Sequence, residues 1–548
     1  MIHRILRHIS LFMILFTLPI IGYSQDGNCT VMFDEGTTHI DGRSNASSVN
    51  PGDTICLLPG TRPFLWLSYL HGSKNNPIVI LNFGGLVTVT GHYYGVKIDS
   101  CSHIKFSGKG ESTFTYGIKI TDVNGAGMSV EGLSTDIEIE GIEVGNTELT
   151  GIFAKTDPSC QFNSTRDKYV LRNLSIHDCY FHHTGMEGMY IGNSFFTGYT
   201  LHCNGTDTLV YPHLLKGVRI YNNYVEHTSW DGIQVSSSDS GCYIFNNTVL
   251  YDSEGSVTNQ MSGILNGGGS ICDCFSNVIK DGKGDGIDIF GQGGQKFYNN
   301  LIVNAGQSNL NEKHGIYVGH VSTISGSSFQ LFNNTIVTPK TSGVKFNNLP
   351  SRNNLISNNI IIQSNANYVV ITNPSISISI ENNLFDQDIN AAAFMNYTLG
   401  NFDLQPTSPA VNTGSDIPGF QLDTDILNRS RPFATYNDRG AFECHDSSLY
   451  SIGDEKNIQV SLKSLYPNPG EDHLFIRFVL QKTEKIVISI YNLQGDLKCQ
   501  QQYDALNPGY HELKIGTSSL SSGLYHCIIR TNNQQVSKKI IITRQQGF

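Results

Sequence analysis

Three short stretches of the sequence place an acidic residue directly before a glycine and a triplet of the form apolar–variable–apolar. They read "EGMYI", "DGIQV" and "DGIDI", so Glu187, Asp231 and Asp285 share one position of a repeated pattern. Asp288 adds another carboxyl group as the variable residue of the last triplet. Glycoside hydrolysis uses two carboxyl groups, one as general acid and the other as base or nucleophile. We therefore take these residues as the candidate catalytic groups.

Histidine and aromatic residues recur around these acids. Trp230, directly before Asp231, could form the apolar wall that keeps a carboxyl group protonated. Aromatic rings stack on sugar rings, and polar side chains hydrogen-bond sugar hydroxyl groups. On this ground the candidate substrate-binding residues are His183, Tyr190, His227, Trp230, Gln234, His314, Tyr317 and Lys155.

The acidic residues also have a purely structural interpretation. Asp, Ser and Asn form turns well because their side chains bond to nearby backbone N–H groups. Glu187 is a poor turn former, however, and neither His183 nor His227 has an evident turn role. The group as a whole therefore favours a chemical role.

Three activities are compatible with these residues. A hydrolase needs the carboxyl groups alone. A polysaccharide lyase needs a uronate neutralised by Ca²⁺ or Arg, and a base, for which the sequence offers Lys155, Arg166, Lys313 and Lys345. A non-catalytic glycan-binding or adhesive protein needs neither. Because acidic residues repel an anionic substrate unless a metal is bound, we place the hydrolase slightly ahead of the lyase.

The acid–glycine pattern belongs to a longer repeat. Between the glycine triplets lie segments with an Asn pair, such as "GVRIYNNYVEH" and "GCYIFNNTVLY". We interpret each class as a short strand, and stacked coils as the way in which such strands bury their apolar residues. The Asn pair suits a sharp bend, and inward Asn amides can bond to one another along the stack. The triplets follow the glycines at positions 95, 117, 151, 188, 232, 263, 286, 315 and 343.

Stacking sets the distances within the candidate site. The first and third residues of each triplet point inward. Asp231 and Asp285 are then separated by one intervening coil, hence by about 10 Å of backbone at roughly 4.8 Å per coil. Their side chains could reach the separation of roughly 6.5–9.5 Å found in inverting glycosidases. The variable residues form a solvent-facing row of Phe153, Tyr190, Gln234, Leu265, Asp288, Tyr317 and Lys345.

The longest segments of the repeat follow the triplets at 151 and 188. They contain insertions, which on a solenoid usually build walls around a site. Cys160 and Cys203 lie in these two insertions. We therefore predict that a disulfide joins the insertions over one edge of the stack.

Several segments carry a resemblance to a known superfamily. "VNPGDTICLLPGTR" and "NPIVILNFGG" near the start, and "DLQPTSPAVNTGS" and "NDRGAFEC" near the end, resemble the right-handed parallel β-helix proteins of the pectate-lyase-like superfamily. The resemblance implies an all-β solenoid over residues 25–444. It does not imply a reaction, because this fold hosts lyases, hydrolases, epimerases and non-enzymes. The compact catalytic motifs of polygalacturonases and pectate lyases are not reproduced, so no residue role is carried over.

The last part of the chain carries a second resemblance. "YPNPG", "YNLQG", "LSSGLY" and "KKIIITR" resemble the type A C-terminal sorting domain of the type IX secretion system of certain Gram-negative bacteria. The resemblance implies a small β-sandwich over residues 460–548, joined by a linker at 445–459. Such a tail is an address for the type IX secretion machinery rather than an active domain.

The N-terminus is typical of a signal peptide, which we place at residues 1–24. His3, Arg4 and Arg7 precede the apolar run "ISLFMILFTLPIIG", which is too short for a convincing membrane span. We expect a secreted or cell-surface protein without a transmembrane span in its mature form. The net charge of −11 argues against nucleic-acid binding. The candidate site residues instead point to a polysaccharide as the partner. Ca²⁺ is expected as a cofactor only if the protein is a lyase.

Overall fold

The computed structural model describes residues 29–308, 312–365, 367–446, 460–466, 472–480, 482–492, 496–521, 523–531 and 535–542. The predicted signal peptide lies outside these residues, as does the predicted linker from residue 447 onward. No helix within the described ranges has the length and hydrophobicity to cross a membrane.

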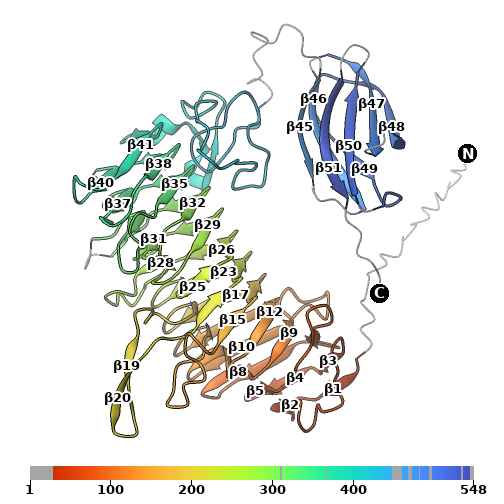
Figure 1. Cartoon of the computed structure of the whole chain (residues 1–548). Helices are drawn as coiled ribbons and strands as arrows, with labels where there is room; N and C mark the ends of the chain where they lie inside the picture. Colours follow the sequence, from red (N-terminus) through yellow and green to blue (C-terminus); the bar gives the residue numbers. More distant parts are fainter. Residues whose placement is uncertain are drawn as a thin grey trace, which may run out of the picture.

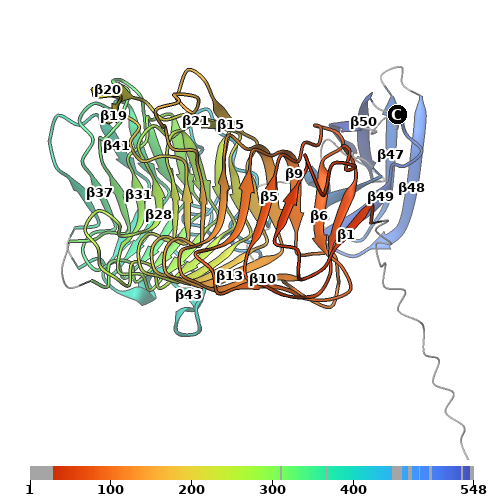
Figure 2. The same ribbon diagram turned by 90° about the horizontal axis from the view of Figure 1, so that it is seen from below.

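The larger part of the chain is a parallel β-helix (Figure 1). Each coil contributes one short strand to each of three sheets, and each strand pairs in parallel with its counterpart in the next coil. Figure 2 shows the coils following one another in chain order, from red to green. We call the sheets 1, 2 and 3 in the order in which the chain visits them within a coil.

Sheets 1 and 2 form two of the faces. In the described residues, sheet 1 has 13 strands: β1 (Val31–Phe33), β3 (Thr54–Leu57), β6 (Ile78–Asn82), β9 (Ser102–Ser107), β12 (Thr135–Glu140), β16 (Ser175–His177), β22 (Arg219–Tyr221), β26 (Cys242–Phe245), β29 (Cys272–Phe275), β32 (Gln295–Tyr298), β35 (Phe329–Phe332), β38 (Asn354–Ser357) and β41 (Ile378–Glu381). Sheet 2 has 12 strands over the same ranges: β4 (Gly60–Arg62), β7 (Val87–Thr90), β10 (Ile118–Val123), β13 (Ile142–Thr147), β17 (Tyr180–Thr184), β23 (Tyr224–Thr228), β27 (Thr248–Leu250), β30 (Val278–Lys280), β33 (Leu301–Val303), β36 (Thr335–Val337), β39 (Ile360–Ile362) and β42 (Leu384–Asp386).

Sheet 3 carries the candidate site. Its 12 described strands are β2 (His39–Asp41), β5 (Leu65–Ser68), β8 (Tyr94–Asp99), β11 (Ala126–Glu131), β14 (Ile152–Ala154), β18 (Met189–Ile191), β24 (Ile233–Val235), β28 (Ser262–Asn266), β31 (Asp285–Ile289), β34 (Ile316–Val318), β37 (Val344–Phe346) and β40 (Val369–Ile371).

Inward apolar residues stack as predicted. Ile233 pairs with Ile264, Ile264 with Ile287, and Ile287 with Ile316, and all four are fully buried. The glycine before each triplet is required by the same stacking. A Cβ on Gly232 would lie 2.6 Å from the carbonyl oxygen of the corresponding glycine in the next coil. Packing therefore requires glycine at this position, whereas the residue before it can carry a catalytic side chain.

The Asn-pair segments differ from the prediction in one respect. Each forms two strands rather than one, because the Asn pair makes the corner between sheets 1 and 2. The first Asn adopts the left-handed conformation, as at Asn222 with φ of 57°. The second builds the predicted amide ladder: Asn223 donates to Asn247 over 3.0 Å. The ladder continues through Asn277, Asn300, Asn334, Asn359 and Asn383.

One triplet of the repeat lies on a different face from the others. The triplet after Gly117 lies in β10 of sheet 2, where Ile118 pairs with Ile142. All three faces of the coil alternate apolar and polar residues in the same way, so the triplet pattern alone does not distinguish sheet 2 from sheet 3.

The insertions add a small layer beside sheet 3. It consists of a parallel sheet of β15 (Val170–Arg172), β21 (Leu214–Lys216) and β25 (Ser238–Ser240), and of a hairpin formed by β19 (Tyr199–Cys203) and β20 (Thr206–Val210). The predicted disulfide between Cys160 and Cys203 is confirmed. Two more disulfides join Cys29 to Cys56 and Cys242 to Cys272.

After β42 the chain covers the outer face of sheet 2. This segment contains the 3₁₀ helices η1 (Ile389–Ala392) and η2 (Tyr397–Leu399) and the antiparallel pair β43 (Phe394–Asn396) and β44 (Asn401–Leu404). Phe394 and Phe402 share an apolar cluster with the outward residues Leu301, Val303 and Val337 of sheet 2.

The tail is a separate β-sandwich, as predicted. One antiparallel sheet contains β45 (Val460–Tyr466), β46 (His473–Leu480) and β49 (Gly509–Gly516). The other contains β47 (Glu484–Asn492), β48 (Leu497–Leu506), β50 (Gly523–Arg530) and β51 (Gln535–Ile542). Residues of both sheets, among them Ile476 and Ile488, form one core.

Candidate active site

The acidic residues form one column along sheet 3, with the register that the sequence predicted. Ser262 and Asp285 are direct partners in adjacent strands, and the Gly232 N–H donates to the Ser262 carbonyl. Asp231 and Asp285 are therefore separated by one coil. The column is more buried than the predicted surface patch, because Glu187, Asp231 and Asp285 are only 2, 0 and 3 % exposed. The carboxyl groups lie at the corner where the chain enters sheet 3.

Asp231 lies in dry surroundings. Ser262 Oγ donates to Asp231 Oδ1 over 2.6 Å, whereas Oδ2 is buried without a hydrogen-bond partner among the described residues. Burial raises the pKa of Asp231 to about 8, the Ser262 hydrogen bond opposes this shift, and the charges of Glu187 and Asp252 add to it. Asp231 therefore holds a proton at neutral pH.

Asp285 lies in the opposite environment. Lys313 Nζ donates to Asp285 Oδ2 over 2.7 Å, and the His314 backbone N–H donates to Oδ1. Burial alone would lower the pKa of Lys313, but the charges of Asp288 and Asp285 outweigh burial and raise it. Lys313 is therefore an ammonium, and both donors stabilise negative charge on Asp285.

Asp288 lies beside the pair of Asp285 and Lys313, on the outer face of sheet 3. Burial, and then the charge of Asp285, raise the pKa of Asp288 well above its usual range against the opposing charge of Lys313. Its Oδ1 is buried without a hydrogen-bond partner in the described structure. Glu187 is similar: burial raises its pKa to about 7, and its Oε2 is likewise unpartnered. The site thus combines carboxyl groups whose pKa values are raised by burial with one, Asp285, that is paired with a fixed cation.

The predicted outward row has the expected register but is not uniformly exposed. Its members, from Phe153 to Lys345, are direct strand partners in successive coils. Gln234 and Asp288, however, are only 2 and 7 % exposed. Tyr190 and Tyr317 remain half-buried.

Polar contacts fix the side chains of this row. Lys155 Nζ lies 4.7 Å from the centre of the Tyr190 ring. Ser194 Oγ lies 2.9 Å from the Tyr190 hydroxyl and accepts from Gln234 Nε2 over 2.7 Å. Gln234 Oε1 is buried and unpartnered among the described residues, so it offers an acceptor to a ligand. Lys155, Tyr190 and Gln234 are thus brought together as predicted substrate-binding residues.

Tyr317 and His314 lie at the other end of the row. Asn347 Nδ2 donates to the Tyr317 hydroxyl over 3.1 Å, and the His314 ring lies 6.1 Å from the Tyr317 ring. Burial lowers the pKa of His314, so its imidazole is neutral at neutral pH. His314 Nδ1 is buried and has no partner in the described residues.

His183 and His227 do have a turn role, contrary to the sequence interpretation. Both adopt the left-handed conformation, with φ of 50° and 52°. Their rings stack on each other at 4.8 Å, and His227 stacks on Tyr251. Trp230 is half-buried, and its backbone N–H donates to the Met186 carbonyl. These three residues line the outside of the turn that leads to the acidic column.

The sequence interpretation missed Asp252. It is fully buried, and its Oδ1 accepts from Ser253 Oγ over 2.7 Å and from the Gly284 N–H over 3.2 Å. The register of sheet 2 places Asp252 beside Thr228, at a corner position that earlier coils fill with Thr147 and Thr184. A carboxyl group in a column of threonines was the signal that could have revealed it.

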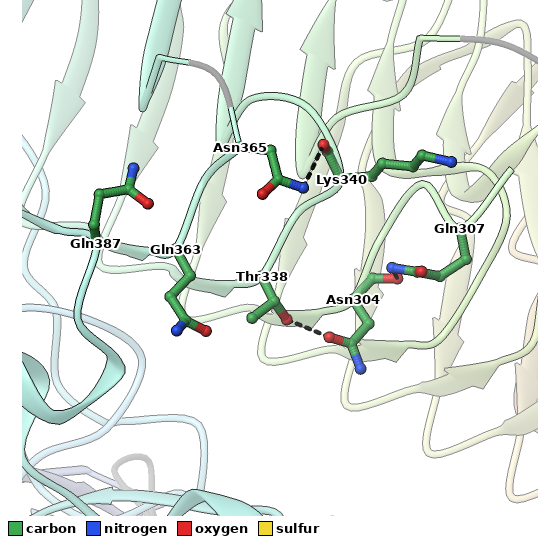
Figure 3. Close-up of a pocket in the computed structure, with 7 residues that line it drawn as sticks. All are labelled: Asn304, Gln307, Thr338, Lys340, Gln363, Asn365 and Gln387. Carbon is green, nitrogen blue, oxygen red and sulfur yellow. Dashed lines mark hydrogen bonds between the residues drawn. The ribbon is translucent and has the colours of Figure 1, made fainter. Parts of the chain in front are cut away.

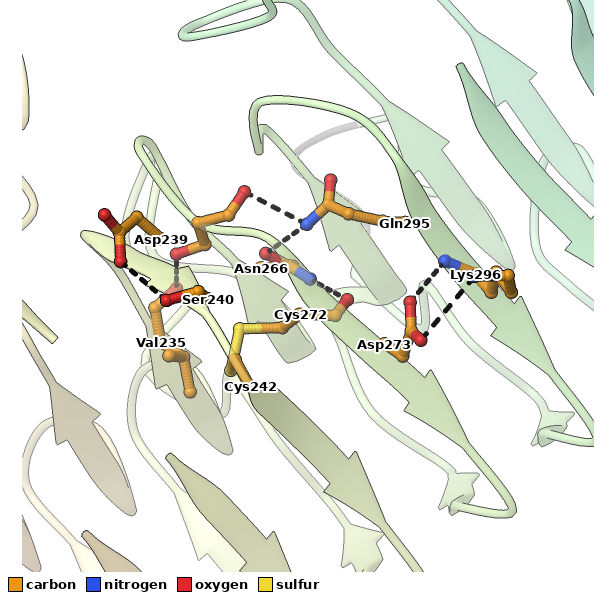
Figure 4. Close-up of a disulfide and its surroundings, with 10 residues drawn as sticks. Val235, Asp239, Ser240, Cys242, Asn266, Cys272, Asp273, Gln295 and Lys296 are labelled. Atoms are coloured by element: carbon orange, nitrogen blue, oxygen red, sulfur yellow. Dashed lines mark hydrogen bonds and ion pairs between the residues drawn. A yellow bond between two sulfur atoms is a disulfide. The ribbon is translucent and has the colours of Figure 1, made fainter. Parts of the chain in front are cut away.

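Loops that follow the strands of sheet 3 are tied together at its far edge. Figure 4 shows Asn266 donating to the Cys272 carbonyl, and Gln295 donating to Asn266 and to a neighbouring carbonyl. This network and the Cys242–Cys272 disulfide fix the loop after β28. Gly269 in that loop adopts a positive φ, and a Cβ there would lie 2.0 Å from the Phe196 ring. The insertion after β18 and the loop after β28 therefore pack tightly together.

Two open hollows lie elsewhere. One of about 510 Å³ is lined by polar side chains at the corner after sheet 2 (Figure 3): Asn304, Gln307, Thr338, Lys340, Gln363, Asn365 and Gln387. Another of about 560 Å³ lies between the insertions and is lined by Phe162, Arg166, Leu209 and Tyr211, among others. Neither includes the acidic column.

The acidic column does not fit a divalent cation. Its Asp285 already has an ammonium partner in Lys313. In the described ranges, the group of three metal-ligand residues with atoms within 4.8 Å of one another is Glu138, Glu140 and His177, on sheet 1. Lys105 lies 2.7 Å from Glu138 and 2.9 Å from Glu140, so that group is an ion-pair network.

Comparison with known proteins identifies the tail. Residues 464–543 match the family described as Secretion system C-terminal sorting domain. No curated protein matches the chain at a significant level of sequence similarity.

Several solved structures are similar to the chain. An alginate lyase from Paenibacillus sp. str. FPU-7 has 13% identity and a TM-score of 0.39, and the match covers 59% of this chain and 99% of the lyase. XylC in complex with xylose has 11% identity and a TM-score of 0.40, over 75% of this chain and 98% of that chain. Tailspike protein 2 of the Escherichia coli O157:H7 bacteriophage CAB120 has 9% identity and a TM-score of 0.30, over 90% and 64%.

At these identities the similarities concern the fold and carry no information about the reaction. The parallel sheets establish the architecture directly, and the family match covers the sandwich. The chain is a right-handed parallel β-helix protein that carries a C-terminal secretion sorting domain.

Proposed function

We propose that the protein is a polysaccharide-cleaving enzyme, and specifically a glycoside hydrolase. The observation that carries the proposal is the contrast between Asp231 and Asp285. They lie in one column, one coil apart, yet Asp231 has a dry environment and Asp285 has the Lys313 ammonium. Two carboxyl groups with contrasting environments, one dry and one beside a cation, are the usual basis of an acid and base pair.

In this proposal Asp231 is the general acid and donates its proton to the leaving glycosidic oxygen. Asp285 is the base that activates a water molecule, and Asp288, beside it, stays protonated because burial and the charge of Asp285 raise its pKa. Two strand spacings separate the backbones of Asp231 and Asp285 by about 10 Å, which suits the roughly 6.5–9.5 Å between carboxyl groups of inverting enzymes. Hydrolysis with inversion of the anomeric configuration is therefore expected.

The row on sheet 3 provides the sugar-binding surface. The half-buried rings of Tyr190 and Tyr317 offer apolar area for sugar stacking. Gln234 Oε1 offers an unpartnered acceptor, and His314 Nδ1 an unpartnered ring nitrogen, to sugar hydroxyl groups. Lys155 lies over Tyr190. The residues His183, His227 and Trp230 lie outside the turn and are proposed to contact only an extended chain.

A hydrolase is favoured over a lyase because the candidate cations are already engaged. Lys155 pairs with Asp157, Lys313 with Asp285, and Lys345 with Glu312, at 3.0, 2.7 and 2.8 Å. The Arg166 guanidinium donates to the backbone carbonyls of Pro212 and Phe196. A uronate would therefore meet carboxyl groups and no spare cation of this set, which disfavours anionic substrates.

The sorting domain supports a secreted or cell-surface location and implies the type IX secretion machinery as a partner. A polysaccharide is a substrate that an exported enzyme meets outside the cell. The predicted signal peptide fits this location.

The proposal is tested by digesting a panel of neutral and uronic polysaccharides. Reducing ends without ultraviolet absorbance are expected from neutral glycans. Asp231→Asn and Asp285→Asn should each lower turnover by about 10²–10⁴-fold, whereas Asp416→Asn, at an exposed position, should not. Unsaturated ends would identify a lyase, and binding without cleavage a glycan-binding protein; either result contradicts the proposal. Full activity of both Asn variants would leave the acids as turn residues, because Asn fills the same turn positions.

A further inference from the structure

Asp252 is a buried carboxyl group that the proposed reaction does not use. Its side chain is enclosed by the coil, and Oδ2 has no hydrogen-bond partner among the described residues. A buried, unpaired carboxyl oxygen destabilises a protein, so its presence calls for a function.

The coil is built to accommodate this carboxyl group. The register of sheet 2 places Gly282 beside Asp252, and a Cβ on Gly282 would lie 1.7 Å from Asp252 Oδ2. Any larger residue at position 282 would displace the carboxyl group. A Cβ on Gly263 would lie 3.4 Å from the same oxygen. Asp252 is therefore lodged between the backbones of two glycines.

This position lies directly behind the acidic column. Gly263 follows Ser262, which donates to Asp231, and Gly284, which donates to Asp252, precedes Asp285. Asp252 thus accepts from the backbone N–H directly before Asp285, and it lies beside the glycine that follows Ser262, the hydrogen-bond partner of Asp231.

We propose that Asp252 is a positioning residue that keeps the proton on Asp231 through the negative charge it holds behind Ser262. The proposal rests on the proposed function, in which Asp231 is the general acid. Asp252 contacts neither substrate nor reacting atoms and acts only through Asp231.

The charge at Asp252 has the sign that this role needs. Burial raises its pKa to about 6, against the hydrogen bonds from Ser253 and Gly284, so the group is ionised above that pH. A nearby negative charge disfavours ionisation of a second carboxyl group and raises its pKa. The other titratable groups that act on Asp231 are Glu187 and Asp288, which raise its pKa when ionised, and the Lys313 ammonium, which has the opposite sign. The charge of Asp285 acts on Asp252 and adds to the rise in its pKa.

The first test is the pH dependence of kcat/KM in Asp252→Asn. A general acid must be protonated, so activity falls as pH rises through its pKa. Without the charge at Asp252, the alkaline limb should move to lower pH by about one unit, and activity above that limb should fall about tenfold relative to its value at pH 6. An equal loss at every pH would indicate a purely structural role and overturn the proposal.

Gly282→Ala provides a second variant that retains the carboxyl group. Its Cβ should displace Asp252 and therefore move the same limb, while Gly282→Ala in an Asp252→Ala background should have little further effect on unfolding. Independent costs of the two substitutions would contradict the packing on which the proposal depends.

A third measurement needs no substrate. The free energy of unfolding should fall with pH over a range set by Asp231, and Asp252→Asn should move that range to lower pH in the wild-type background but not in Asp231→Asn. If the wild-type protein cleaves no glycan, the proposed function fails, and this measurement still decides whether Asp252 controls the proton on Asp231. An unchanged range in Asp252→Asn would refute that control.

Discussion

Replacing Asp231 by Asn should make the β-helix more resistant to alkaline pH. The pKa of Asp231 rises from 3.8 to about 8 on folding, chiefly because the group is buried. The folded state then binds a proton that the unfolded state releases, so stability is present at low pH and is lost as pH rises through the folded-state pKa. Integrated between pH 5 and pH 9, one such group lowers the free energy of unfolding by about 4 kcal/mol.

An amide at this position does not titrate, so Asp231→Asn should remove about 4 kcal/mol of this pH dependence. Urea unfolding of the full chain at pH 5, 7 and 9, followed by tryptophan fluorescence, measures the effect. The two tryptophans, Trp66 and Trp230, both lie in the β-helix, so the signal reports on that domain. Asp416→Asn, at an exposed site, is the matched control.

An unchanged pH dependence in Asp231→Asn would refute the protonated state of Asp231 and with it the assignment of the general acid. Glu187 and Asp252, whose pKa values burial raises to about 7 and about 6, should leave a residual dependence in the variant. Asp288 and Glu443 add to that residual dependence, because burial raises the pKa of Asp288 well above its usual range and the pKa of Glu443 to about 8.

Three further outcomes are expected. Gly286→Ala should destabilise the β-helix by about 1–3 kcal/mol, because its Cβ would lie 2.5 Å from Ile302 and 2.6 Å from a backbone oxygen; urea unfolding checks this, and a neutral result would contradict the close stacking. Asn277→Ala should cost about 2–3 kcal/mol, more than the same change at the exposed Asn75, because two rungs of the amide ladder break. Removal of residues 460–548 should leave glycan cleavage intact and abolish secretion, measured in the medium and in cell lysates.

The coil architecture was predictable because every coil packs on the next in the same way. Inward isoleucines such as Ile233 and Ile287, and inward amides such as Asn223, recur at one position per coil, so a single stacking rule places all of them. The same rule gave the register of Asp231 and Asp285. The Cys160–Cys203 disulfide was predictable because both insertions leave the same edge of sheet 3.

The environment of the site was not predictable, because it depends on contacts between coils. Whether Asp231 is dry depends on the loops that cover the corner, and whether Asp285 is paired depends on Lys313, 28 residues further along the chain. Asp252 could have been found as a carboxyl group in a column of threonines, but its close contact with Gly282 required the structure. The turn role of His227 required its backbone conformation, since histidine is an uncommon residue at positive φ.

The amide ladder also determines where the β-helix can open. Opening a coil at the end of the ladder breaks one amide–amide hydrogen bond, whereas opening a coil such as that of Asn277 breaks two. Local opening should therefore begin at the last coil and proceed inward, as in other solenoids whose repeats contact only their neighbours. The coils that carry Asp231 and Asp285 are seventh and ninth among the 12 described strands of sheet 3. Amide hydrogen exchange should consequently be slower around these carboxyl groups than around Asn383.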